Sequence, residues 1–91
     1  MYGENMNIIC MYDVEGTTSV KLLHILRKYL FHVQRSVFQG TLTLAKFKKL
    51  EKELAAVKLK PTDQILFYFT YRDNDLYEKS IGKPIEPRNI I

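Results

Sequence analysis

The pattern of apolar and polar positions first marks the strands. Residues 7–13, "NIICMYD", and residues 64–71, "QILFYFTY", are rich in β-branched and aromatic side chains and contain no Gly or Pro, so both are predicted strands. Residues 31–43, "FHVQRSVFQGTLT", are also extended in pattern and are punctuated by Gly40. The pattern leaves open whether this segment is one bent strand or two short ones.

Two segments between these strands have the apolar spacing of amphipathic helices. Residues 19–30 place Leu and Ile side chains on one arc of a helical wheel and basic or imidazole side chains on the opposite arc. Residues 44–57 have a similar stripe. The candidate N-cap residues are Thr17, Thr18 and Ser19 for the first helix and Thr43 for the second.

The order of these elements predicts the fold class. Helices that alternate with strands over about 70 residues suggest a sheet with both helices on one face, which is an α+β, ferredoxin-like βαββαβ sandwich. The strands at 7–13 and 64–71 are apolar on both sides, yet two helices cover only one face of a sheet. The other face would be a large exposed apolar patch. A second copy of the chain is the simplest cover, so we predict a homodimer paired sheet to sheet.

The end of the chain has a different pattern. Pro84 and Pro87 interrupt the segment "SIGKPIEPRNII", which restricts it to an edge strand or an arm. We therefore expect a ferredoxin-like domain over residues 1–78 and a C-terminal arm or edge strand over residues 79–91.

Composition agrees with one small folded domain. The chain has 91 residues, of which 46% are hydrophobic. Cys10 is the single cysteine, so an internal disulfide is excluded and a reducing compartment is expected. No apolar run approaches the ~20 residues of a membrane helix, and the start of the sequence lacks the pattern of a signal peptide. We expect a cytoplasmic protein with no membrane partner.

Charge is unevenly distributed along the chain. Residues 16–50 contain seven Lys or Arg residues and no Asp or Glu, whereas the remainder has seven basic and ten acidic residues. Such a segment predicts binding to nucleic acid if its charges share one surface, and a merely solvated surface otherwise. The candidate nucleic-acid-binding residues are Lys21, Arg27, Lys28, Arg35, Lys46, Lys48 and Lys49.

Asp13 ends the first predicted strand, where an aspartate can begin a turn, cap the next helix or hold a metal ion. Together, the strand end "MYDV", the segment "VQRSVFQG" and the strand "ILFYF" resemble the second CRISPR-associated protein family. This family is the small dimeric subunit of the spacer-acquisition machinery, and the similarity extends over about residues 7–71. It implies ferredoxin-like protomers that pair through their sheets, with the C-terminal strand often crossing to the partner.

The resemblance also implies a site. Asp13 matches the family aspartate that faces its mate across the two-fold axis, and the two carboxylates can share a Mg²⁺ ion. Mg²⁺ prefers hard oxygen ligands and keeps several waters, which suits two carboxylates and a phosphate oxygen. The predicted catalytic residues are Asp13, Tyr12, Arg35, Ser36 and Phe38, with Asp13 as the metal ligand and Arg35 neutralising phosphate charge.

Two positions depart from the family pattern. Many members have arginines just after the "YD" segment, whereas this chain has "VEGTTSVK", in which Lys21 is the only cation. Phe31 precedes His32 at a position where many members have glycine. The first difference puts phosphate contacts at that point in doubt.

Three functions follow as hypotheses. One is a metal-dependent endonuclease that cuts single-stranded RNA or double-stranded DNA. Another is a scaffold that binds duplex DNA along its basic surface and bridges dimers of the CRISPR integrase. A third is an RNA-recognition-type module that stacks bases on strand aromatics, although the "KGFGF" pattern of such modules is missing. Neither His24 nor His32 has a second His or a Cys at ligand spacing.

Overall fold

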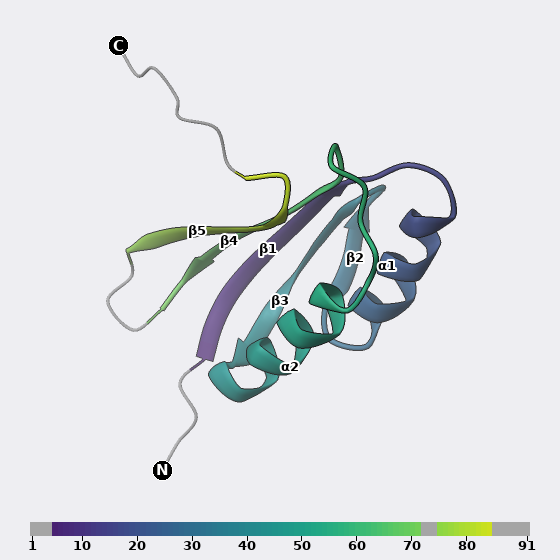
Figure 1. Ribbon diagram of the computed structural model, residues 1–91. Coiled ribbons are helices and arrows are strands. Elements are labelled where there is room, and N and C mark those ends of the chain that lie inside the picture. Colours follow the sequence, from purple (N-terminus) through teal and green to yellow (C-terminus); the bar gives the residue numbers. More distant parts are fainter. Residues whose placement is uncertain (1–4, 72–74, 85–91) are drawn as a thin grey trace.

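The computed structural model describes residues 5–71 and 75–84. Five strands and two helices follow one another in this part of the chain (Figure 1). They are β1 (Asn5–Asp13), α1 (Thr17–Arg27), β2 (Phe31–Gln34), β3 (Val37–Thr43), α2 (Leu44–Ala55), β4 (Gln64–Thr70) and β5 (Leu76–Gly82). No helix among these residues is long and apolar enough to span a membrane.

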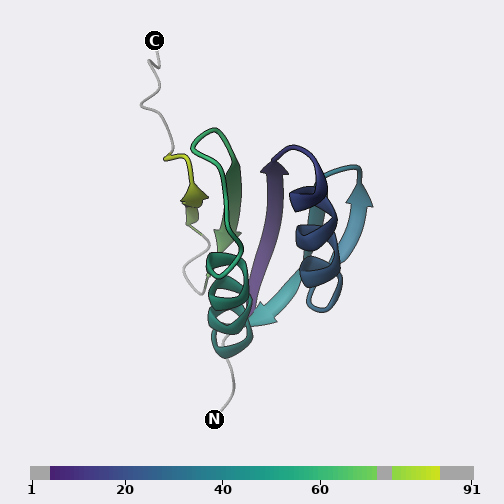
Figure 2. The same cartoon turned by 45° about the vertical axis from the view of Figure 1, so that its right-hand side comes forward.

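The strands form one antiparallel sheet in the order β2-β3-β1-β4-β5. Both helices lie on the same face of this sheet, with α1 over the β2 side and α2 over the β4 side (Figures 1 and 2). The α+β class predicted from the sequence is confirmed. The order of the first four strands is that of a ferredoxin-like fold, and β5 extends the sheet beyond β4.

The core lies between the sheet and the helices. Alternate residues of β1 (Met6, Ile8 and Cys10) are at most 2% exposed, and Phe38 and Phe67 from the neighbouring strands are fully buried beside them. Phe47 of α2 packs its ring edge against Phe67, with ring centroids 5.2 Å apart. The remaining core side chains are Leu22, Leu26, Leu30, Leu42, Leu50, Leu54 and Ile65.

The opposite face of the sheet has no helix, and we call it the open face. It is formed by the other residues of the same strands, and its apolar centre consists of Ile9, Met11, Val37, Leu66 and Tyr68. Ile9 is 44% exposed, although it is adjacent in sequence to two buried residues. The prediction that the central strands are apolar on both sides is therefore confirmed.

The two helices begin differently. Thr43 caps α2 as predicted, because its hydroxyl accepts a hydrogen bond of 3.2 Å from the Lys46 main-chain N–H. The predicted side-chain cap of α1 is wrong. Gly16 is the N-cap, with φ 68°, and the Ser19 hydroxyl donates to its carbonyl oxygen instead. Glycine takes this position because the backbone there has a positive φ.

Residues 31–43 are two strands and not one bent strand. β2 and β3 form a hairpin whose turn contains Arg35, at φ 39°, and the pairing shifts by one residue between His32 and Gln34. Gly40 does not break the chain but lies within β3, where an added Cβ would come within 3.0 Å of Leu30. Close packing beneath the helix layer thus explains this glycine.

β5 is the edge strand at the β4 side of the sheet. It begins at Leu76, so the division proposed between residues 78 and 79 falls inside a strand that pairs with β4 of the same chain. The end of β5 is held by the Lys83 main-chain N–H, which donates to the Asp63 carbonyl oxygen at 2.8 Å. The predicted arm beyond Pro84 lies outside the described residues.

Candidate functional site

Asp13 is exposed at the end of β1, on the open face of the sheet. The β2–β3 turn and the first residue of β4 meet it there, because Met11 pairs with Val37 and Asp13 pairs with Gln64. Together these elements enclose a depression of about 340 Å³. Its lining residues are Met11, Tyr12, Asp13, Ser36, Val37, Gln64 and Leu66.

Tyr12 and Phe38 belong mainly to the other side of the sheet. Phe38 is fully buried in the core and stacks on the imidazole of His32, with ring centroids 4.6 Å apart. The Tyr12 ring lies 6.3 Å from that of Phe38. Burial raises the pKa of Tyr12, while the nearby charge of Arg27 acts in the opposite direction. Phe38 thus packs in the core, on the helix-covered side of β3.

Arg35 and Ser36 form the turn at the Asp13 end of the sheet. The Ser36 carbonyl oxygen accepts a hydrogen bond of 3.2 Å from the Tyr12 main-chain N–H, which fixes the turn against β1. His32 Nε2 donates to the Arg35 carbonyl oxygen, which closes the hairpin from the other strand. Arg35 is exposed, and Ser36 lines the depression with Asp13. The structure thus brings Asp13 and Ser36 together, with Arg35 next in sequence.

The side chains that line the depression supply only some of the oxygen ligands that a hard cation such as Mg²⁺ needs. Among residues 5–71 and 75–84, no three His, Cys, Asp or Glu side chains gather closely enough to hold a metal ion. One chain instead offers the Asp13 carboxylate, the Ser36 hydroxyl and the Gln64 amide, which are all oxygen donors. Mg²⁺ is bound in this way, by one or two carboxylates with waters completing its shell.

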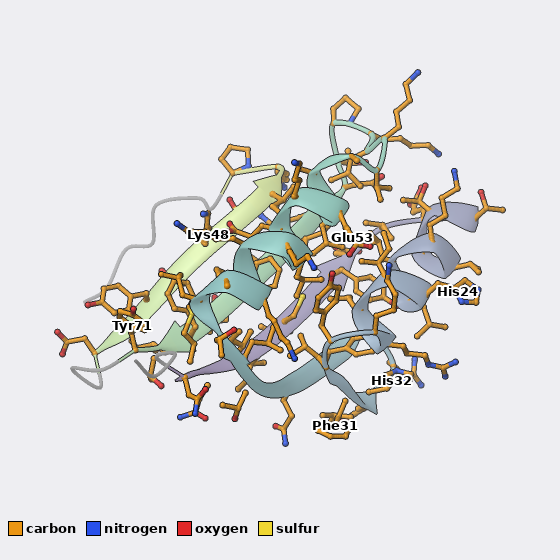
Figure 3. The ribbon with its side chains drawn as sticks, turned by 90° about the horizontal axis from the view of Figure 1, so that it is seen from below. His24, Phe31, His32, Lys48, Glu53 and Tyr71 are labelled. Carbon is orange, nitrogen blue, oxygen red and sulfur yellow. The ribbon has the colours of Figure 1, made fainter. Side chains whose placement is uncertain are left out.

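The basic residues of the 16–50 segment lie mostly on the helices, away from the open face. Lys21, Arg27 and Lys28 belong to the α1 end of this layer, and Lys46, Lys48 and Lys49 to α2; all six are exposed. Figure 3 shows Lys48 on the side of α2 that is turned away from α1. The six cations therefore lie on the same layer of the protein, but they are distributed over both helices.

Lys28 differs from the other six cations. It is the only one of the seven with an ion-pair partner in the described part of the chain, the carboxylate of Glu53 on α2. The Tyr29 hydroxyl donates to the same carboxylate, which turns toward α1 (Figure 3). Hydrogen bonds from Lys28 and Tyr29 lower the pKa of Glu53, and the bond to Glu53 raises the pKa of Tyr29. Lys28 thus links the two helices as well as contributing positive charge.

The aromatic residues of β4 divide between the two faces. Phe67 is buried, and Phe69 packs between Phe47 of α2 and Tyr77 of β5. Tyr68 is the aromatic residue of β4 on the open face. Base stacking across the sheet requires several exposed rings on that face, so this arrangement lends little support to an RNA-recognition-type module. His24 lies on the outer side of α1 and His32 on β2 (Figure 3), and neither belongs to a group of metal-ligating side chains within residues 5–71 and 75–84.

The sequence matches one protein family over most of its length. The family model for "CRISPR associated protein Cas2" covers residues 6–77, which runs from the start of β1 into β5. The chain belongs to the Cas2 family. The resemblance seen in "MYDV" and "VQRSVFQG" is thereby confirmed.

Curated relatives and a solved structure agree with this assignment. The chain is 34% identical over 87 residues to "CRISPR-associated endoribonuclease Cas2" of Methanosarcina acetivorans, covering 94% of this chain and 100% of that protein. It is 40% identical over 63 residues to the protein of the same name in Thermotoga maritima, covering 69% and 72%. A structure described as "Crystal structure of cas2" is 31% identical, with a TM-score of 0.68 and coverage of 96% and 98%.

The depression is lined by one polar residue that is not among the predicted site residues. Gln64 was read only as the start of a strand, yet it lies opposite Asp13 and lines the same depression. Its amide nitrogen donates to the main-chain carbonyl oxygens of Lys83 at 2.9 Å and Pro84 at 3.3 Å. The polar side chain of Gln64 at the start of an otherwise apolar strand was the only indication in the sequence of a role beyond packing. The spacing of residues could not predict that this strand pairs with β1.

Proposed function

We propose that this Cas2-family protein is a Mg²⁺-dependent endonuclease that cleaves RNA and acts as a homodimer in CRISPR spacer acquisition. The observation that carries the proposal is the exposed Asp13 carboxylate at the end of a central strand, at the margin of an apolar open face. The names of the relatives in Methanosarcina acetivorans and Thermotoga maritima, both endoribonucleases, support the choice of RNA as substrate.

The open face supports pairing of two chains. Its centre is apolar, Ile9 is 44% exposed, and both helices lie on the other side. A second copy that packs face to face buries this surface, as an isologous two-fold interface requires. Asp13 lies at the end of the same face, so the two-fold operation brings two copies of its depression to the same interface.

The chain's own residues have distinct roles in this proposal. Asp13 supplies a charged oxygen ligand, and Ser36 supplies a hydroxyl at the rim of the depression. Arg35, exposed on the adjacent turn, neutralises charge on the phosphate. A Mg²⁺ ion bound there supplies activation of water and stabilisation of charge on the phosphodiester. Tyr12 and Phe38 hold the strand and the turn in place from the core side.

A second function is favoured by a separate observation. The exposed cations of α1 and α2 lie on the helix layer, across the sheet from Asp13. We propose that this surface binds the phosphate backbone of duplex DNA without reading bases, and that the dimer thereby bridges the CRISPR integrase. Binding and cleavage would then use opposite sides of the protomer, and each can be removed without the other.

The test compares two variants on the same substrates. Wild type, Asp13→Asn and a charge reversal of Lys46, Lys48 and Lys49 to Glu are each mixed with labelled single-stranded RNA or duplex DNA, in Mg²⁺ or EDTA. Asp13→Asn should abolish Mg²⁺-dependent RNA cleavage and leave duplex binding intact. The charge reversal should weaken duplex binding about tenfold or more and flatten its salt dependence.

Each outcome decides a separate point. Cleavage that survives Asp13→Asn would overturn the nuclease proposal, and duplex affinity unchanged by the charge reversal would overturn the DNA-binding surface. Light scattering on the same samples tests the pairing, since a monomer at all concentrations contradicts it. Binding by both wild type and Asp13→Asn, with cleavage by neither, leaves a DNA-holding subunit without catalysis.

A further inference from the structure

The outward side of α2 carries three lysines that the packing of the helix places together. The buried side chains of α2 all lie on the side that faces the sheet. On the opposite side, residues three and four positions apart are neighbours. This exposed strip, which we call the α2 ridge, consists of Lys48, Lys49 and Lys52, with exposed alanines beside them. Lys49 and Lys52 also line one depression of about 410 Å³. The three lysines therefore share one surface.

On the flank of α2 that faces β5, Glu51 is held away from the ridge. It lies three residues after Lys48, a spacing at which a glutamate and a lysine can pair on a helix surface. The Glu51 carboxylate instead pairs with Lys79 of β5, and its side chain is only 19% exposed. Lys48, on the side of α2 turned away from α1 (Figure 3), is left without an ion pair within residues 5–71 and 75–84.

The flank toward α1 has the same arrangement. Glu53 lies four residues after Lys49, yet its carboxylate binds Lys28 and the Tyr29 hydroxyl (Figure 3). Hydrogen bonds from these two groups lower the pKa of Glu53, and the charge of Lys49 adds to the effect. Lys52 has no Asp or Glu three or four residues away on either side. Neighbouring elements thus bind both acids of α2, and no ridge lysine forms an ion pair within the described residues.

The composition of the ridge indicates the class of ligand that it fits. After Leu44, every exposed residue of α2 is a lysine or an alanine. A helix that lies on a membrane surface presents large apolar side chains beside its cations, and a groove for single strands presents aromatic rings on which bases stack. The ridge has neither. Lysines contact phosphates without reading bases, so the ridge fits the phosphate backbone of a duplex.

We propose that the α2 ridge is the part of the helix layer that binds the phosphate backbone of duplex DNA, with Lys52 as a phosphate contact and Lys79 as a positioning residue. Lys79 acts through Glu51, because their ion pair keeps this carboxylate from neutralising Lys48 or repelling a phosphate. The proposal rests on the DNA-binding function proposed above and narrows it to one helix. Lys52 and Lys79 both lie outside the acid-free segment 16–50, whose charge predicted the binding residues.

Fluorescence anisotropy of a labelled duplex of mixed sequence, at several salt concentrations and in EDTA, tests the role of Lys52. The full chain is compared as wild type, Lys52→Ala and Lys83→Ala, which removes the same charge from an exposed residue after β5. Lys52→Ala should weaken binding about threefold or more and reduce the salt slope by about one for each ridge in contact. Lys83→Ala should change neither. Equal effects of the two variants would overturn the assignment of Lys52. Circular dichroism checks that each variant is folded.

A second comparison tests Lys79 by rescue. Lys79→Ala releases Glu51, so duplex binding should weaken although Lys79 is not on the ridge. Adding Glu51→Gln removes the released charge and should restore the affinity of wild type. Adding Glu15→Gln instead restores the same net charge, but in the exposed loop before α1, and should restore little. Equal rescue by both would mean that only net charge matters, which contradicts a positioning role, as does a Lys79→Ala variant that binds like wild type.

The remaining outcomes separate this inference from the proposed function. If charge reversal of Lys46, Lys48 and Lys49 weakens duplex binding while Lys52→Ala and Lys79→Ala leave it unchanged, the DNA-binding surface stands and the α2 ridge is wrong. If wild type binds no duplex even at low salt, both are overturned. Vesicles that contain phosphatidylserine are the second probe. Vesicle binding that depends on Lys52, with duplex binding that does not, would assign the ridge to a membrane surface and overturn the proposal.

Discussion

The two faces of this sheet are built from the same strands but have different environments. In β1, Ile8 and Cys10 face the helices and are at most 2% exposed, whereas Ile9, between them in sequence, faces away and is 44% exposed. β4 has the same division, with Phe67 fully buried and Tyr68 only half-buried on the open face. Apolar composition therefore does not distinguish the face that stabilises the protomer from the face that is available for association.

The polar residues mark the difference between the faces more clearly. On the helix side, polar groups pair with one another, as in the contact of Glu53 with Lys28 and Tyr29. On the open face, the Thr41 hydroxyl donates to Asn7 Oδ1, whereas Asp13, Gln64 and Ser36 line a depression where β1 ends and β4 begins. The comparison teaches that the candidate site lies at the margin of an apolar surface, the surface through which we propose that two chains pair.

The sharpest test of this comparison uses the same substitution on each face. Ile8→Ala removes buried methyl groups and should lower the free energy of unfolding by about 2–5 kcal/mol. Ile9→Ala should cost about 1 kcal/mol or less in the protomer, because nearly half of its side chain is already in contact with water. Urea denaturation monitored by circular dichroism measures both values.

Protein concentration serves as the control for this pair of variants. Association through the open face makes stability depend on concentration, and Ile9→Ala should reduce that dependence while Ile8→Ala retains it. Equal costs for the two variants at low concentration would contradict the distinction between the faces.

The next test concerns the edge where the two faces end. Gly82 has φ 87°, and an added Cβ would lie 2.5 Å from the Asp63 carbonyl oxygen and 2.9 Å from Leu59 Cδ1. Gly82→Ala should therefore cost more than the ~1–3 kcal/mol of an unfavourable backbone conformation alone. Gly16→Ala is the matched control, since φ is 68° there and no atom lies within 4 Å of the added Cβ.

Thermal denaturation measures how much each of the two glycine substitutions lowers the stability of the protein. A cost for Gly82→Ala that is no greater than for Gly16→Ala would mean that the chain after β5 moves aside easily. The attachment of this segment to Asp63 and Gln64 would then be weaker than its hydrogen bonds indicate.

Much of the fold followed from local sequence pattern. The stripe that includes Leu22 and Leu26, the cap at Thr43 and the two apolar sides of β4 each depend on spacing within one element. The sequence pattern did not distinguish a hairpin of β2 and β3 from one bent strand, because the turn at Arg35 and Ser36 contains no Gly, Asn or Pro. In the sequence pattern, Gly40 suggested an interruption of the extended segment. In the structure it lies within β3, where the absence of a side chain leaves room for Leu30.

The candidate site was predicted less completely than the fold. Asp13 and Ser36 were found through family motifs, and the structure places them in one depression. Phe38 was grouped with them through the same resemblance, and alternation along β3 places it in the core. Gln64 was missed because its position depends on pairing across β1 and on carbonyls 19 and 20 residues further along the chain. No periodicity encodes contacts of that kind.

A smaller effect is expected from the polar contact on the helix side. Hydrogen bonds lower the pKa of Glu53, so its stabilising contribution is present above the unfolded value of about 4.3 and is lost as pH falls through the lower folded value. Glu53→Gln should reduce the urea midpoint at pH 7 and should differ little from wild type near pH 2. A variant that matches wild type at both pH values would show that this exposed contact does not stabilise the helix pair.

The last and smallest effect concerns Cys10, whose thiol reports by its reactivity whether solvent reaches the helix-covered face. Burial raises the pKa of this thiol to about 12, so only about 10⁻⁴ of it is ionised at pH 8. A thiol-specific aromatic disulfide reagent should therefore react with the native protein only through rare opening of the core, and at full rate in urea. Cys10→Ser, which cannot react, gives the baseline. Rapid reaction of the native protein would show that solvent reaches the helix-covered face, and the contrast with Ile9 on the open face would then be one of degree.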